Sequence, residues 1–447
     1  MSRRLSALLA LLSLTLASPL AAQVEKPDET EEAPDYAGAT LSGDWGGSRH
    51  AAWRAGWALD GALKVDSMKS LGGKNPGSRS MSNLDLRARA DLGKLVGWED
   101  ATAYLHMVDN RGTGINAQHT DSLMGVSNIE VAEPTTRLFH AWLQQNFFDD
   151  QLSLLAGLYP IDSEFFAMDS AALLVQPQFG VPSDLALTRG PSIFNSSAFG
   201  LRAKWQSADR TRYLMGAVLD GIPNDPAHPK RTAIKFDKGD GIFSIAEFGW
   251  MPLEYGHAFE PTDPARSLQT PMLVRHERYG GVSKYAIGLW RYGNKVEDLI
   301  DIDANGDPLR RRSQGAYVLA ERTLLGLAGA GRDLTVFARH SRSDGDTIEL
   351  DRMWNLGIRI RGPLASRPDD TLAIGWTQSR LAHKYRRAEA AIGNARAIHE
   401  DAVEITWRAA ITPYFALQPI LQSVHRPGGS SKEPHPIILG LRVEIAL

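Results

Sequence analysis

Cysteine and net charge are the first things that this sequence lacks. It contains no cysteine, and its formal net charge is only −3. The missing cysteine fits export to an oxidising compartment, although many cytosolic proteins lack cysteine too. The near-balance of charge gives no indication of nucleic-acid binding, so we expect no nucleic-acid partner.

Long apolar runs are also missing. Beyond the N-terminus, no run reaches the roughly 20 residues that a membrane-spanning helix requires. This excludes a bundle of membrane helices. It does not exclude a β-barrel, because barrel strands alternate lipid-facing and lumen-facing residues and their mean hydropathy stays near zero.

The short motifs of common enzymes are missing as well. The sequence has no Gly-x-Ser-x-Gly, no His-Glu-x-x-His and no phosphate-binding glycine loop, so we expect no enzymatic activity. An outer-membrane hydrolase is a formal rival, but it would require a catalytic Ser-His pair that the spacing does not show. An adhesin or receptor is another rival, but it would usually plug its barrel, and no plug-sized domain is present.

The first 22 residues are typical of a secretory signal peptide. Arg3 and Arg4 precede an apolar stretch that ends at Leu16, and small residues follow up to Ala22. The apolar stretch is too short for a membrane anchor, so we expect residues 1–22 to be cleaved from an exported protein.

Residues 23–57 follow as a predicted periplasmic N-terminal segment. Its first part is acidic and contains proline, which favours a loose leader. A short helical pattern then runs from Ser48 to Trp57, with Ser48 as the expected N-cap and Gly56 as the expected stop.

From residue 58 to residue 447 the sequence alternates with a period of two. In residues 83–92, apolar residues alternate with Asp85, Arg87 and Arg89, and a face that carries such charges must meet water. We therefore predict an all-β fold, a sixteen-stranded antiparallel transmembrane β-barrel over residues 58–447. The predicted strands begin near residues 58, 83, 101, 136, 152, 198, 212, 241, 282, 314, 333, 352, 371, 402, 414 and 435.

The connections are short on one side and long on the other, as expected for such a barrel. One connection, at about 252–281, is long although it lies on the side where the connections are otherwise short. It indicates a periplasmic insertion or a misplaced strand. The long connections are 109–134, 161–197, 222–240, 293–313 and 381–401. Aromatic residues near the short turns predict a girdle at the membrane boundary. These are Trp98, Phe147, Phe148, Trp205, Tyr213, Trp250, Tyr414 and Phe415.

Several motifs occur in order along the chain. They are Leu41 to Arg49 (LSGDWGGSR), Val126 to Glu130 (VSNIE), Pro134 to Leu138 (PTTRL), Asp162 to Phe165 (DSEF), Arg367 to Asp370 (RPDD), Leu417 to Pro419 (LQP), His425 to Gly429 (HRPGG) and Leu439 to Arg442 (LGLR). Over nearly its whole mature length the chain thereby resembles the carbohydrate-selective porins of the OprB type. The resemblance implies a loop-narrowed sixteen-stranded barrel in the outer membrane of a Gram-negative bacterium.

The expected function is passive diffusion of neutral sugars, meaning monosaccharides such as glucose or related sugars and polyols. A sugar channel needs hydrogen-bonding side chains and an aromatic ring for stacking. We expect loops 109–134 and 161–197 to fold inward and to narrow the pore. The predicted pore-lining residues are Arg87, Arg89, Arg111, His140, Trp142, Glu164, Arg202, Lys204, Glu247, Trp290, Arg339 and Arg359. For each of these residues the alternative to binding a solute is a structural role, in which the side chain hydrates the barrel wall and pairs with a side chain on a neighbouring strand.

Two of these predictions carry named alternatives. Basic residues outnumber carboxylates on the inward face, so a general, weakly anion-selective diffusion porin is the alternative function. Trp142 lies mid-strand with His140 and Gln144 on its face, away from the girdle. Its indole either stacks against a sugar ring or is wedged under an inward loop.

A candidate metal site lies in one long connection. Asp301, Asp303, Asn305 and Asp307 match the start of a calcium loop, but Arg312 replaces the glutamate expected at its twelfth position. An exposed polar hairpin tip is the alternative. No other cofactor is expected. The expected partners are sugars, the lipid bilayer, lipopolysaccharide and the outer-membrane assembly machinery, and the chain is predicted to be a monomer or a homotrimer.

Overall fold

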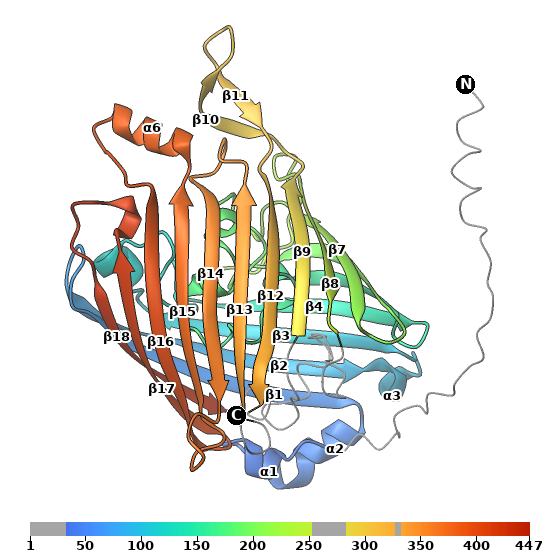
Figure 1. Cartoon of the computed structure of the whole chain (residues 1–447). Helices are drawn as coiled ribbons and strands as arrows, with labels where there is room; N and C mark the ends of the chain where they lie inside the picture. Colours follow the sequence, from blue (N-terminus) through green and yellow to red (C-terminus); the bar gives the residue numbers. More distant parts are fainter. Residues whose placement is uncertain (1–32, 253–282, 327–331) are drawn as a thin grey trace, which may run out of the picture. The chain divides into compact units, whose positions relative to one another are not determined.

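A computed structural model describes residues 33–252, 283–326 and 332–447. The predicted signal peptide and residues 253–281 of the unusual connection lie outside these ranges. Sixteen antiparallel strands of the described residues form a closed barrel, in which the first strand pairs with the last (Figure 1). The predicted fold class and strand number are confirmed.

Most strands begin within a few residues of the predicted positions, but β2 begins six residues before its predicted start near residue 83. They are β1 Trp57–Ser70, β2 Gly77–Asp91, β3 Ala101–Gly112, β4 Thr135–Phe147, β5 Leu152–Tyr159, β6 Ala198–Gln206, β7 Arg212–Asp220, β8 Ile242–Trp250, β9 Ser283–Tyr292, β12 Gln314–Gly326, β13 Asp333–Ser343, β14 Leu350–Arg361, β15 Thr371–Leu381, β16 His399–Thr412, β17 Phe415–His425 and β18 Ile437–Ala446. Two further strands, β10 Val296–Ile302 and β11 Pro308–Arg311, form a separate hairpin between β9 and β12 (Figure 1).

The helices are short. They are α1 Tyr36–Ala39, η1 Trp45–Gly47, α2 Ser48–Arg54, α3 Leu92–Val96, η2 Asn116–Thr120, η3 Ile161–Ser163, η4 Pro177–Phe179, α4 Ser183–Ala186, α6 His383–Ala391 and η5 Pro427–Gly429. Within the described ranges, no helix is long and apolar enough to cross a membrane. The predicted N-terminal helix is present as α2, but Gly47 is its N-cap and Ser48 is its first residue.

Side-chain alternation gives the barrel two different faces. Leucines such as Leu105, Leu201 and Leu289 are at least half exposed on the outer face, whereas buried charged strand residues such as Glu247, Arg339 and Glu404 lie on the inner face. Trp98, Phe148 and Trp250 of the predicted girdle are exposed near the short turns, as an interfacial belt requires. Tyr213 is different, because its ring points inward and is 2% exposed.

One β-bulge interrupts the alternation. His106 of β3 pairs with His140 of β4, but its neighbour Met107 pairs with Leu138, so Phe139 is an extra residue. The bulge keeps His140 and Trp142 on the inner face and turns Leu138 to the outer face beside Met107. Uninterrupted alternation along β4 predicts Leu138 on the same face as His140, and the bulge makes that prediction wrong.

Candidate pore constriction

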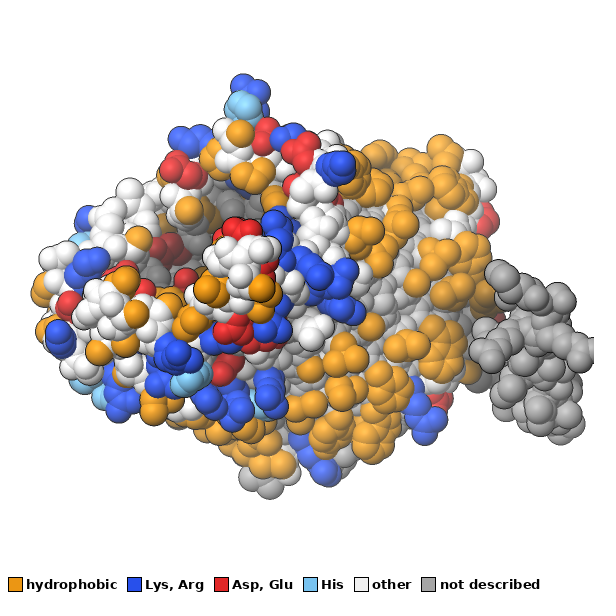
Figure 2. Space-filling model, turned by 90° about the horizontal axis from the view of Figure 1, so that it is seen from above, with side chains coloured by type: hydrophobic (Ala, Val, Ile, Leu, Met, Phe, Trp, Pro, Cys, Tyr) orange, Lys and Arg blue, Asp and Glu red, His pale blue; other side chains and the backbone are white. Residues whose placement is uncertain are grey.

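Two long loops contact the inner wall far from their own strands. The first inner loop, residues 113–134, connects β3 to β4, and the second inner loop, residues 160–197, connects β5 to β6. Their contacts reach β8, β12, β13 and β16 to β18. Figure 2 shows the hollow that opens at the loop end of the barrel.

Inward glutamates hold both loops through their backbone N–H groups. Glu404 on β16 accepts from the N–H groups of Val175 and Gln176 at 2.7 and 2.8 Å. Glu400 lies four residues before Glu404 on the same face of β16. It accepts from the backbone N–H of Leu123 in the first inner loop at 3.1 Å. Each carboxylate therefore satisfies loop donors that would otherwise be buried without a partner.

The predicted residue Glu247 belongs to the same kind of anchor. Its carboxylate accepts from the Phe166 N–H at 3.2 Å, and the hydroxyls of Tyr213 and Tyr317 also donate to it. Glu321 on β12 does the same for Ser170, whose N–H and hydroxyl lie 2.9 and 2.6 Å away. Glu247 thus serves to position the loop and is only 1% exposed.

Arg339 is the cationic counterpart of these anchors. It is 1% exposed and donates to the carbonyl oxygens of Gln178, Gly180 and Phe166 at 2.6, 2.5 and 3.0 Å. Asn355 accepts two further hydrogen bonds from the same guanidinium. This predicted pore-lining arginine therefore fixes the second inner loop and has almost no surface left for a solute.

Three predicted residues meet in one buried cluster. Glu164 of the second inner loop lies 2.8 Å from Arg202 Nε and 3.8 Å from Lys204 Nζ. Arg202 also donates to Gln144 at 2.8 Å and to the Ser153 hydroxyl at 2.8 Å. The cluster joins the start of the loop to β4, β5 and β6.

Two aspartates of the second inner loop, the buried Asp184 and the partly buried Asp162, bind a proton more tightly than an ordinary aspartate. Asp162 accepts from the Phe194 N–H at 3.0 Å, which joins the two ends of the loop. Asp184 accepts from the Ser341 hydroxyl on β13. Burial raises the pKa of Asp162 and of Asp184 to about 6, because the charged forms lose water.

Other inward charges face one another on the wall. Arg87 Nε on β2 lies 2.6 Å from Asp60 Oδ1 on β1, and Arg408 Nε on β16 lies 2.8 Å from Glu444 Oε2 on β18. We call these four residues the paired strip. Sequence reasoning missed Asp60, although the same alternation that places Arg87 inward also places it there.

A chain of polar side chains continues from this strip towards the loops. Asp85 accepts from Asn83 at 2.8 Å, Asn83 accepts from Asn110 at 2.8 Å, and Asn110 accepts from Asn195 of the second inner loop at 2.9 Å. Asp85 also lies 2.8 Å from His106 Nε2. Sequence reasoning missed the asparagines, because amides at alternate positions are also ordinary in hydrated strands.

The remaining predicted residues occupy different surroundings. His140 accepts from the Trp142 indole N–H at 3.3 Å, and Trp142 packs 4.9 Å from the Tyr104 ring with 4% of its surface exposed. Trp290 is 3% exposed. Neither indole has a free face for a sugar in this structure, so the structure favours packing for Trp142.

The last basic residues differ in position. Arg359 faces inward and shares Asp333 with Arg361, while Arg89 faces inward on β2 and is partly exposed. Arg111 was expected in an inward loop, and this is wrong. Strand β3 continues to Gly112, which puts Arg111 on the outer face, where it pairs with Asp109 and donates to Thr136 at 2.9 Å.

The predicted calcium residues surround the turn of the β10–β11 hairpin. Asp301 already pairs with Lys384 and Arg311 at 2.7 and 3.1 Å, and Asp303 accepts from the N–H groups of Asn305 and Asp307. The described part of the chain gathers no three His, Asp or Glu side chains suited to a metal ion. Calcium binding here stays a prediction.

A closed sixteen-stranded barrel with an apolar outer face and loops fixed across its interior defines a porin, a passive channel of the outer membrane. The family model for carbohydrate-selective porins of the OprB family matches residues 76–447. The chain belongs to this family, which places it in the outer membrane of a Gram-negative bacterium and makes it a channel rather than an enzyme.

Known relatives cover most of the chain. Porin B of Pseudomonas aeruginosa is 21% identical over 443 residues, which is 90% of each protein. The putative porin QuiX of Acinetobacter baylyi is 21% identical over 432 residues, with 91% of this chain and 92% of the relative covered. The high-pH structure of Pseudomonas putida OprB superposes with a TM-score of 0.79 at 19% identity and covers 93% of this chain and 100% of its own. This last likeness supports the fold.

Proposed function

We propose that the chain lets small neutral sugars, meaning monosaccharides such as glucose or related sugars and polyols, diffuse passively through a passage between the inner loops and the paired strip. The pairing of Arg87 with Asp60 at 2.6 Å is the observation that carries this proposal. Such a pair offers donors and acceptors for hydroxyl groups while its net charge is zero.

Neutral solutes gain most from a wall of this kind. A hydroxyl donates to Asp60 or Glu444 and accepts from Arg87 or Arg408, so it replaces the hydrogen bonds that it made to water. An ion that sheds water meets both signs of charge and gains little net attraction. The printed description of the family, carbohydrate-selective porin, supports the same substrate class.

A general, weakly anion-selective porin is the second candidate. One observation favours it: Arg359 and Arg361 on β14 both pair with the carboxylate of Asp333, so two guanidiniums share one carboxylate on this part of the inner wall. A fixed charge in a narrow passage enriches ions of the opposite sign.

Planar-bilayer conductance separates the two candidates. We expect glucose and related sugars at modest concentrations to block the ion current, and we expect a reversal potential near zero in a salt gradient. A current that no sugar reduces, together with a reversal potential shifted towards anions, would establish the general porin instead. A non-channel protein would give no steps of conductance.

A further inference from the structure

Three arginines occupy directly opposed positions on the outer face, at the loop end of the barrel. Arg342 on β13 is the cross-strand partner of Arg352 on β14, and Arg352 is the partner of Arg380 on β15. We call these three residues the outer arginine row. His399 on β16 is the next partner along. Like charges directly opposite one another destabilise a sheet, so two successive Arg–Arg pairs require compensation.

The described residues supply one carboxylate for it, that of Asp351, which acts electrostatically on all three arginines. The side chains of Arg342 and Arg352 make no hydrogen bond or ion pair with any described residue, and the buried Nε of Arg352 lacks an acceptor. Arg380 Nε forms an ion pair with Asp351 Oδ1 at 3.5 Å, without a hydrogen bond. Arg386 of α6, which also acts electrostatically on Asp351, has an unpartnered buried Nε as well. One carboxylate thus faces several guanidiniums.

The surface beneath the row marks the membrane boundary. Trp354 follows Arg352 on the same face of β14, stacks on His340 at 3.9 Å and is 40% exposed. Leu356 comes next and is 43% exposed. An interfacial tryptophan between charges and leucines is typical of the level of lipid headgroups. In Figure 2, basic side chains gather around the loop end, and the outer wall below is largely hydrophobic.

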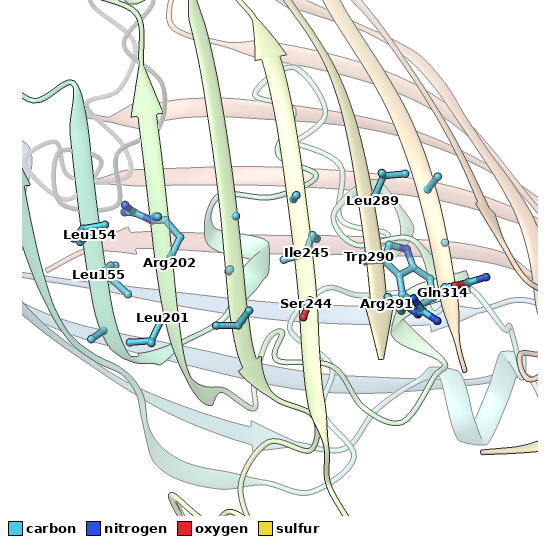
Figure 3. Close-up of a pocket in the computed structure, with 18 of the residues that line it drawn as sticks. Leu154, Leu155, Leu201, Arg202, Ser244, Ile245, Leu289, Trp290, Arg291 and Gln314 are labelled. Atoms are coloured by element: carbon cyan, nitrogen blue, oxygen red, sulfur yellow. The ribbon is translucent and has the colours of Figure 1, made fainter. Parts of the chain in front are cut away.

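An apolar groove of about 1070 Å³ adjoins the row. Most of its lining residues occupy outward-facing positions of β4 to β9 and β12, and its lining extends to Arg291 and Arg342. Small residues such as Ala203, Gly216 and Ala246 form its floor, and Leu154, Leu201 and Leu289 flank it (Figure 3). The outer wall therefore combines a concave apolar surface with arginines that lack acceptors.

We propose that the outer arginine row and this groove bind a phosphorylated glycolipid of the outer leaflet, the lipid A part of lipopolysaccharide. Its phosphates accept hydrogen bonds from the guanidiniums of Arg342, Arg352 and Arg380, which arginine makes in bidentate fashion. Its acyl chains fill the groove. Two other occupants fit less well. Free phosphate has no acyl chains to fill the groove. A second copy of this chain would have to place an acidic patch against the outer arginine row.

The decisive measurement compares lipids on the unmodified protein. Purified porin, stripped of lipid in detergent, is titrated with bisphosphorylated lipid A, with the same lipid after enzymatic removal of its phosphates, and with inorganic phosphate. Native mass spectrometry counts bound molecules. We expect at least tenfold tighter binding of the phosphorylated lipid than of the other two. Equal binding of the dephosphorylated lipid, or saturation by inorganic phosphate alone, would overturn the proposal, as would copies of the chain occupying the groove.

Variants then assign the site. The combined change Arg342→Gln, Arg352→Gln and Arg380→Gln is expected to weaken lipid A binding at least tenfold. The control removes three exposed basic side chains of another loop, through Lys230→Gln, Arg231→Gln and Lys238→Gln, and should leave binding unchanged. Equal loss in both variants would contradict a specific site. If the first variant does not fold, as judged by its β-type circular dichroism, the lipid comparison above decides alone.

Discussion

Arg49 Nη2 lies 3.0 Å from the backbone carbonyl oxygen of Leu447. The same guanidinium donates to the Leu59 carbonyl at 2.7 and 2.9 Å and stands 4.1 Å from the centre of the Tyr36 ring. One buried side chain therefore connects the N-terminal segment to β1 and to the residue that follows β18. Because β1 and β18 pair to close the barrel, Arg49 stabilises the junction between the first and the last strand.

Replacing Arg49 with Ala is expected to destabilise the closed barrel. The change leaves the Leu59 and Leu447 carbonyl oxygens without this donor, and the expected cost is about 2–4 kcal/mol. The measurement is the temperature at which the folded band is lost in detergent gel electrophoresis. Arg54→Ala, an exposed arginine on the same helix, is the control and should change nothing. Equal heat resistance of both variants would contradict the role of Arg49.

Removing one member of the paired strip should change ion selectivity in a predictable direction. Arg87→Gln leaves Asp60 uncompensated, so the reversal potential in a salt gradient should move towards cations. Asp60→Asn should move it towards anions. The double variant restores neutrality and should return the potential close to that of the unmodified channel. Single variants whose reversal potentials equal that of the unmodified channel would show that the pair does not face the ion path.

Releasing the second inner loop should widen the channel. Glu404→Ala removes the acceptor of the Val175 and Gln176 N–H groups, so we expect larger single-channel conductance and weaker block by sugars. Glu404→Gln keeps one acceptor oxygen and should have a smaller effect. Glu297→Ala on the exposed β10 hairpin is the matched control. Unchanged conductance in Glu404→Ala would mean that this anchor does not set the pore width.

The docking of the second inner loop should strengthen as the pH falls. The pKa of Asp184 is about 6 in the folded protein and 3.8 ordinarily, so its proton binds more tightly in the folded state between these values. Stability is gained as the pH falls from above 6 to about 4, by about 3 kcal/mol at most. Amide hydrogen exchange of residues 183–186 between pH 4 and 8 measures this gain in stability.

Asp184→Asn should remove most of this pH dependence, and Asp162→Asn should remove what Asp162 contributes. Asp209→Asn is the control, because hydrogen bonds from Ser207 and Thr211 lower the pKa of Asp209 to about 2, outside the range tested. Equal pH dependence in Asp184→Asn and in the unmodified protein would show that another group controls the loop.

Trp142→Ala should reduce stability more than it changes sugar block. The buried indole packs against Tyr104 and its truncation leaves a cavity, for which the expected cost is about 3–5 kcal/mol. Thermal unfolding gives the stability, and sugar titration of the channel current gives the block. Loss of sugar block with unchanged heat resistance would instead establish a stacking site at this ring.

Local signals explain how much of the fold was predictable from the sequence. Strand β5 begins at Leu152 as expected, and β1 begins at Trp57, one residue from the expected start, because alternation and turn residues are read within a few positions. The bulge at Phe139 could not be predicted from the sequence, because it depends on the register in which β3 pairs with β4. Arg111 was placed on the wrong side for a related reason, since the true end of β3 sets its face.

The site was less predictable than the fold, because its contacts join distant parts of the chain. Alternation does place Glu404 and Arg339 inside, but it does not reveal their partners. Glu404 meets Val175, 229 residues earlier, and Arg339 meets Gln178, 161 residues earlier. Several side chains expected to touch solute, among them Glu247 and Arg339, are therefore engaged with loops instead.

The long sequence separation of the loop anchors has a consequence for the order of folding. Ser170 reaches Glu321 across 151 residues, and Ser122 reaches Glu400 across 278 residues. Contacts between such distant segments form late, because a long stretch of chain must first be brought together. The strands that carry the anchors must be in place before either loop can dock. A newly closed barrel should therefore be briefly wide and leaky, and it becomes a selective filter only in the last step of its maturation.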